Sequence, residues 1–188
     1  MDIDQSQREA PVAGADSLLL REPAAADAPA LFALINTNRS RLAPWLPWVE
    51  ATRAEADTLA FIAHSHARRA GGSAATWLIE QSGELIGVID LHDINPVTRS
   101  AAVGYWLGRA SEGRGWMHLA LEQVVRQAWG AMGLLILHID TDPRNVRSQH
   151  VALAAGFLSD PIRSRAVESV SYTLHHPDWT QQDVFLQS

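Results

Sequence analysis

The stretch from Ala101 to Met132 constrains the fold more than any other, because it predicts a strand, a glycine turn and a helix in direct succession. The apolar run Ala102–Leu107 has the length and composition of a β-strand. A loop that contains Gly108 and Gly113 follows it. From Gly115 onward, apolar residues recur at the spacing of one helix face. A junction of this kind directs several backbone N–H groups outward from a helix start.

This junction is a candidate cradle for a pyrophosphate. A helix N-terminus favours negative charge, and glycines let the backbone approach a bulky phosphate without a Cβ between them. A dinucleotide-binding unit is one alternative, but Gly113–His118 supplies only two of the three glycines it needs, although Asp140 and Asp142 offer an acid after the next apolar run. A phosphate-binding P-loop is a second alternative, but this stretch lacks the Gly-Lys-Ser/Thr ending that a P-loop needs. By spacing alone, a tight turn without any ligand is an equal alternative.

The order of the other elements predicts a mixed, mostly antiparallel central sheet with helices on both faces, an α/β (α+β) fold. A meander of short-turn strands precedes the glycine loop, whereas a doubly wound fold would place βαβ units on both sides of it. One helix is expected after Pro23, with its apolar pattern ending near Asn36–Asn38. A second is expected to begin at a capping box over Thr52–Glu55. The expected strands are Ser17–Arg21, Ala75–Glu80, Leu85–Leu91, Ala102–Leu107, Leu134–Ile139 and Val167–Leu174, with a short helix at Asn145–Ala154.

Length and composition predict one domain over residues 17–188, preceded by a flexible tail over residues 1–16. The chain has 188 residues, 47% of them hydrophobic and 19% charged, and no cysteine. It has no apolar run long enough for a membrane span and no basic-then-apolar leader, so a cytoplasmic protein without membrane contact is expected. A net charge of −6 disfavours nucleic acid as a partner and suits a basic protein. A homodimer is compatible with the sequence.

Four short segments together resemble the GNAT superfamily of N-acetyltransferases, most closely the RimJ/RimL branch, which acetylates protein N-termini, notably of ribosomal proteins. They are Tyr105-Trp106-Leu107, Glu112–Met117, Asn145–Ser148 and Ala155–Phe157, and the resemblance extends from about Leu18 to Trp179. It implies a GNAT-like fold and acetyl-CoA as co-substrate, with no metal. The residues that it assigns to acetyl-CoA are Trp106, Leu107, Gly113, Arg114, Gly115, Trp116, Met117 and Asn145.

The resemblance also implies how the chemistry is done. In this family the strand before the glycine loop splays from its neighbour and offers backbone N–H groups to the thioester carbonyl, here near Trp106 or Leu107. Ser148 is the expected proton donor to the leaving thiolate; the alternative is that Asn145 caps its helix and Ser148 bonds only to backbone. No general base is named, although Glu80, Glu84, His92, Asp93 and His138 are all on or near strands.

The acceptor side is less defined by the sequence. Leu42–Trp48 contains two prolines and two tryptophans, so it is either a loop that plugs the core or an aromatic wall for the acceptor, with Trp45 and Trp48 as binding residues. The family carries a similar segment beside its acceptor site, but its final hairpin is longer than Leu158–Ser171 here. The expected acceptor is a protein α-amine; the alternatives are a small amine such as a polyamine or an antibiotic, and a non-catalytic acyl-CoA-binding module.

Overall fold

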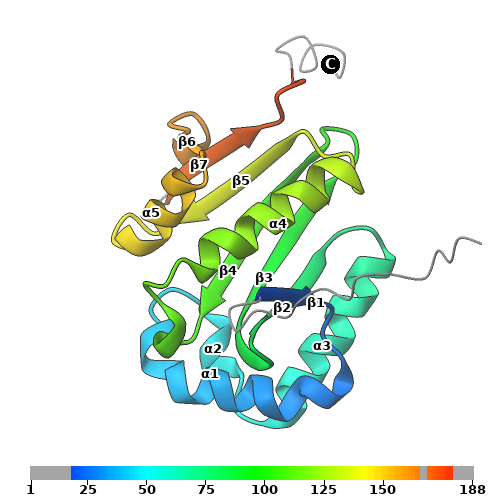
Figure 1. Cartoon of the computed structure of the whole chain (residues 1–188), viewed down its shortest axis with the longest axis vertical. Coiled ribbons are helices and arrows are strands. Elements are labelled where there is room, and N and C mark those ends of the chain that lie inside the picture. The colour runs from blue at the N-terminus through cyan, green and yellow to red at the C-terminus, as the bar shows by residue number, and fades with distance from the viewer. Residues whose placement is uncertain (1–17, 166–168, 180–188) are drawn as a thin grey trace, which may run out of the picture.

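The computed structural model describes residues 18–165 and 169–179, which form one seven-stranded sheet in the order β1-β2-β3-β4-β5-β7-β6 (Figure 1). The strands are β1 (Leu18–Arg21), β2 (Ala75–Gln81), β3 (Glu84–Asn95), β4 (Ser100–Leu107), β5 (Ile136–Thr141), β6 (Leu158–Ser159) and β7 (Val170–His175). The helices are α1 (Ala28–Leu42), α2 (Trp48–Ala51), α3 (Glu55–Ala70), α4 (Trp116–Gly130) and α5 (Val146–Ala154). Short 3₁₀ turns are η1 (Ala25–Asp27), η2 (Arg109–Ser111) and η3 (Arg163–Arg165).

The strand pairing confirms the expected mixed sheet. β4 and β5 are parallel, and every other neighbouring pair is antiparallel. The meander β1–β4 ends at the glycine loop, and α4 then crosses back over the sheet to start β5 (Figure 1). The expected tail over residues 1–16 and the predicted start of the last strand at Val167 lie outside the described residues.

The sheet separates two hydrophobic clusters because successive side chains of a strand point to opposite faces. On one face, Trp77, Ile89 and Val103 pack with Leu121 and Val124 of α4. On the other face, Leu78, Val88 and Trp106 pack with Leu31, Ile35 and Ile62 of α1 and α3. Within the described ranges, no helix has the length and apolar character needed to cross a membrane.

The sequence predicted the end of α1 wrongly. The helix continues through Asn36–Asn38 to Leu42, because Asn38 points into the protein instead of ending the helix. Its amide nitrogen donates to the Leu34 oxygen at 2.8 Å, and its Oδ1 accepts from the Arg109 N–H at 2.9 Å. A polar residue that looks like a helix terminator thus fastens α1 to the loop after β4.

The predicted capping box at Thr52–Glu55 was also wrong. Helix α3 begins at Glu55, and the carboxylate of Asp57 accepts hydrogen bonds from the Arg53 and Ala54 N–H groups at 2.7 and 2.8 Å. The Thr52 hydroxyl instead donates to the oxygen of Trp48, the first residue of α2. The short helix α2, which the sequence does not predict, takes Thr52 as its C-cap, so α3 begins later.

Candidate active site

The candidate site lies where β4 and β5 separate. The two strands are paired only between Ser100–Ala102 and Ile136–His138, and beyond Ala102 the pairing stops. A cleft of about 770 Å³ opens there, lined by residues of β4, the glycine loop, α1, β5 and α5. The expected splay is therefore confirmed, and a strand edge with unpaired backbone groups faces the cleft.

Strand alternation identifies which β4 groups face this gap. The Gly108 N–H donates to the Ile86 oxygen of β3 at 2.8 Å, whereas the Arg99 oxygen accepts from the Leu135 N–H on the β5 side at 2.7 Å. Because N–H and C=O groups alternate in direction along a strand, the N–H groups of Val103, Tyr105 and Leu107 point toward the gap. The Trp106 N–H points toward β3, so of the two expected oxyanion donors, Leu107 has the suitable backbone direction.

The glycine loop forms the second part of the site. Gly115 precedes α4 with φ 80° and Gly113 has φ 72°, a left-handed conformation that glycine adopts without strain. The first helical bond joins the Leu119 N–H to the Gly115 oxygen, so the helix leaves the N–H groups of Trp116, Met117 and His118 for an outside acceptor. Both glycines, Trp116 and Met117 line the cleft, and the exposed Arg114 stands between the glycines without being part of the lining.

An ion-pair network that the sequence did not reveal fixes this loop. Glu112 accepts from Arg41 of α1 and, at 3.2 Å, from Arg147 of α5. Arg41 also donates to the Leu107 oxygen at the end of β4. The two arginines therefore connect the glycine loop to both walls of the cleft. These partners are 71 and 35 residues from Glu112 in sequence, so no local pattern could have indicated them.

Ser148 lies in the cleft beside a tyrosine. Asn145 caps α5 by accepting from the Ser148 N–H at 3.3 Å, and both residues line the cleft. The Tyr105 hydroxyl donates to the Ser148 oxygen and also lies 3.1 Å from Ser148 Oγ. Burial raises the pKa of Tyr105 to about 12, so its hydroxyl stays protonated. The capping role of Asn145 and a proton-donating role of Ser148 are thus compatible, and Tyr105 is a partner of Ser148 that the sequence does not indicate.

The two tryptophans of the Leu42–Trp48 segment are not in the core. Trp45 is 37% exposed and lines the cleft, whereas Trp48 is 42% exposed and is not in the lining. The Trp48 ring packs against that of Trp106, with centroids 6.2 Å apart. The interpretation of this segment as a core plug therefore fails for the tryptophans but holds for Leu42 and Leu46, which pack in the hydrophobic cluster of α1 and α3. Trp45 faces the cleft directly, and Trp48 contacts the cleft only through Trp106.

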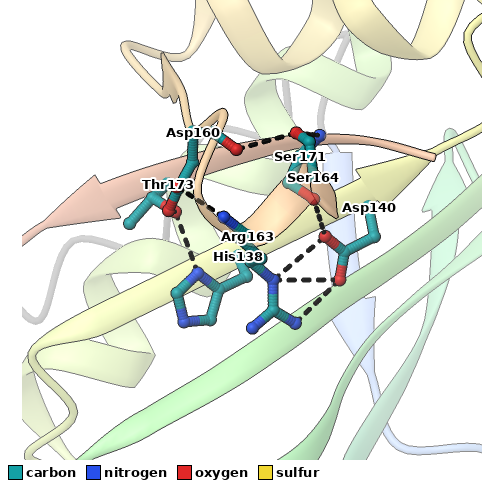
Figure 2. Close-up of polar contacts among 7 residues, drawn as sticks. All are labelled: His138, Asp140, Asp160, Arg163, Ser164, Ser171 and Thr173. Atoms are coloured by element: carbon teal, nitrogen blue, oxygen red, sulfur yellow. Dashed lines mark hydrogen bonds and ion pairs between the residues drawn. The ribbon is translucent and has the colours of Figure 1, made fainter. Parts of the chain in front are cut away.

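On the sheet face away from α4, a polar cluster joins β5, β7 and the segment after β6 (Figure 2). Thr173 donates to Asp160 Oδ2 at 2.8 Å, so its oxygen accepts from the Nδ1–H of His138 at 2.9 Å. Next to it, Arg163 pairs with Asp140 at 2.7 Å. This cluster holds the segment after β6, a strand of only two residues, against the sheet.

The lowered pKa of His138 predicts that the free energy of unfolding falls in weak acid. Burial lowers the pKa of His138 to about 4, from about 6.5 in an unfolded chain. The unfolded state therefore binds the proton first, and stability falls as the pH drops from about 6.5 toward 4. Each pKa unit is about 1.4 kcal/mol, and solvent screening of the partly exposed ring reduces this, so we expect roughly 1–2 kcal/mol between pH 7 and 5.

Urea unfolding of the wild type and of His138→Gln at pH 7 and pH 5 measures this loss. The variant should lose less stability between the two pH values. His92, whose pKa is raised mainly by its hydrogen bond to Asp90, has the opposite sign: its contribution is complete below pH 6.5. Equal losses in the two proteins would show that His138 is not the titrating group.

Comparison with known proteins identifies the class to which this fold belongs. Residues 17–158 match the family model of the acetyltransferase (GNAT) domain. The chain therefore belongs to the GNAT family and is an acetyl-CoA-dependent N-acetyltransferase. The expected family and fold are confirmed.

One relative and two solved structures of the same fold illustrate the similarity. The chain is 30% identical over 128 residues to the ribosomal-protein-serine acetyltransferase of Escherichia coli (strain K12), which covers 68% of this chain and 72% of the relative. RimL, a ribosomal alpha-N-protein acetyltransferase solved in complex with coenzyme A, has a TM-score of 0.80 at 23% identity over 85% of this chain and 94% of its own. The microcin C7 self-immunity acetyltransferase MccE, solved with acetyl-CoA and AMP, has a TM-score of 0.78 at 23% identity over 85% and 92%.

Proposed function

We propose that this enzyme transfers the acetyl group of acetyl-CoA to the N-terminal α-amine of a protein, such as a ribosomal protein. The observation that carries the proposal is the unpaired edge of β4, which opens onto a cleft lined by the start of α4 and by Ser148. The identity to the ribosomal-protein-serine acetyltransferase supports the acceptor class.

The residues present fit acetyl-CoA. The Gly113–Met117 backbone would hold the pyrophosphate, because a Cβ on Gly113 or Gly115 would meet open space now available to a phosphate. The outward N–H groups of Tyr105 and Leu107 would pair with the pantetheine arm and hold the thioester oxygen. When bound, acetyl-CoA supplies an activated acetyl group. Ser148 would deliver a proton to the leaving sulfur, and its Oγ lies 3.1 Å from the Tyr105 hydroxyl.

The charge of the cleft supports a peptide acceptor over a polyamine. The acids in its lining are each paired with an arginine: Glu112 with Arg41 and Arg147, Asp140 with Arg163, and Asp142 with Arg144. A polycation needs unpaired carboxylates, because an ion pair already satisfied by arginine offers it little attraction. The aromatic wall at Trp45 suits the side chains of a peptide instead.

A panel of acceptors tests the proposal. Thiol release from acetyl-CoA is measured with short peptides carrying a free N-terminal serine or alanine, with spermidine, and with an aminoglycoside. The proposal predicts the highest kcat/KM for a peptide. A preference for spermidine or the aminoglycoside would assign the enzyme to small amines.

Trp45→Ala is expected to raise the KM for a peptide acceptor about tenfold, since an aromatic contact in a cleft contributes about 1–1.5 kcal/mol. The affinity for acetyl-CoA should change little. Trp48→Ala is the matched control, because Trp48 is similarly exposed but outside the cleft lining. Steady-state kinetics beside calorimetry with acetyl-CoA makes the measurement, and equal KM values for both variants would remove Trp45 from the acceptor wall.

A further inference from the structure

On the sheet face away from α4, β3 carries a second set of polar groups, one strand from the gap between β4 and β5. Asp90 and His92 point to this face, and His92 Nδ1 lies 2.7 Å from Asp90 Oδ1. In the strand register, Asp90 is opposite Gly104 of β4, and His92 is opposite Ala102. The pair therefore flanks the point at which β4 leaves β5.

Gly104 connects this pair to the cleft. A Cβ on Gly104 would lie 3.0 Å from Asp90 Oδ2 and 3.3 Å from His92 Cε1, so both side chains lean over that residue. Gly104 also lines the cleft, and because it has no side chain, its backbone is open to the cleft. Ser148 and Tyr105 lie on the α4 and α5 side of the sheet. The Asp90–His92 pair is thus on the opposite face of the sheet from the expected proton donor, one strand from the gap, and it adjoins the cleft lining at Gly104.

The pair is accessible and oriented. The His92 and Asp90 side chains are 36% and 30% exposed, so an amine can reach them. With its Nδ1–H donated to Asp90, the His92 ring keeps the Nε2 lone pair outward, and in the described part of the chain Nε2 has no hydrogen-bond partner. A carboxylate that holds one nitrogen of a histidine fixes its tautomer and stabilises the imidazolium that forms.

We propose that His92, oriented by Asp90, is the general base that removes a proton from the acceptor ammonium on this face of the sheet. The N–H bond of the ammonium breaks and an Nε2–H bond forms. The neutral amine then attacks the thioester carbon, and the C–S bond breaks. Ser148 Oγ gives its proton to the leaving sulfur and takes up the second proton that the amine nitrogen loses. The imidazolium afterwards releases its proton to water. This inference rests on the proposed acetyl transfer.

The surroundings of His92 suit a base that works near neutral pH. The hydrogen bond to Asp90 raises the pKa of His92, and burial opposes it; the charge of Asp93 raises the pKa further, and that of Arg68 on α3 lowers it. His138 of β5 is on the same face of the sheet, opposite Ala102 of β4. A base is more effective when its pKa is closer to that of the ammonium.

His138 is the competing candidate, and its environment is less suitable. Burial lowers the pKa of His138 to about 4, and Arg163 adds to this effect, so it is a weak base toward an ammonium. Two other candidate bases, Glu80 and Glu84, are far from the gap, and Glu80 is already in an ion pair. Glu80 pairs with Arg21 at 2.5 Å on β2, two strands from β4, and Glu84 lies at the β2–β3 turn.

The pH dependence of His92→Gln tests the inference. An α-amine with a pKa of about 8 is about one-tenth neutral at pH 7 and mostly neutral at pH 9. We expect kcat/KM for the peptide to fall about tenfold at pH 7 and to approach the wild-type value near pH 9. Asp90→Asn should shift the acidic limb of the profile to lower pH. His138→Gln is the matched control and should follow the wild-type profile.

A second readout does not depend on turnover. The imidazole NMR signals of the acetyl-CoA-free protein are followed while the acceptor peptide is added, and the His92 signal should shift while that of His138 stays. A loss in His92→Gln that is the same at pH 7 and 9, a pH-dependent loss in His138→Gln instead, or an unmoved His92 signal would overturn the inference. If the acceptor panel selects a small amine, the same comparison is made with that amine, so an error in acceptor class is seen separately.

Discussion

Ser148→Ala is expected to lower kcat by about 10²–10⁴ while leaving the Kd for acetyl-CoA nearly unchanged. A proton donor acts mainly in the transition state, and loss of general-acid catalysis typically has this size. The Asn145 cap should survive, because its hydrogen bond comes from the backbone N–H of residue 148. Stopped-flow or steady-state thiol release, with calorimetry for acetyl-CoA, gives both quantities.

Tyr105→Phe and Ser159→Ala complete this experiment. Tyr105→Phe removes only the hydroxyl next to Ser148 Oγ and should lower kcat by a smaller factor, because Ser148 remains. Ser159→Ala, on the exposed strand β6, is the control and should behave as the wild type. If Ser148→Ala turned over at the wild-type rate, Ser148 would have no role in proton transfer and only a structural role at the start of α5.

The second large effect is expected at the glycine loop. Gly113→Val or Gly115→Val should weaken acetyl-CoA binding about 100-fold, because valine is strained at φ 72° or 80° and its side chain would occupy the space beside the orphan N–H groups. Losing two charge-assisted hydrogen bonds to phosphate, at about 1.5 kcal/mol each, corresponds to that factor.

Gly130→Ala is the matched control for this loop. It lies at the other end of α4, where a Cβ would meet open space, so affinity should be unchanged. Circular dichroism and thermal melts of each variant confirm that the helix is intact. An unchanged Kd in a folded Gly115→Val protein would place the pyrophosphate elsewhere.

The order of elements was predictable because it depends on local patterns. The apolar run before Gly108 and the helical spacing after Gly115 predicted β4 and α4, and the short turns before them predicted the meander. The resemblance to GNAT proteins then predicted the splay between β4 and β5, which the register confirms. Asn145 also occupies the predicted capping position.

The sequence could not predict groups that meet only through the tertiary fold. Asn38 looked like a helix terminator because its partner, the Arg109 N–H, is 71 residues away. Glu112 and Arg41 are separated by the same number of residues, so their pairing had no local sign. His92 was one of several candidate bases, and only the register that places Asp90 beside Gly104 distinguishes it.

The most direct test of the account is mass spectrometry of one peptide in two forms after incubation with the enzyme and acetyl-CoA. One form has a free N-terminus and an internal lysine; the other has the same sequence with its N-terminus blocked. At pH 7 a lysine amine needs about 3 kcal/mol more than an α-amine to be deprotonated. We expect one acetyl group, on the α-nitrogen of the free form, and none on the blocked form. Acetylation of the lysine in both forms, or of neither peptide, would contradict it.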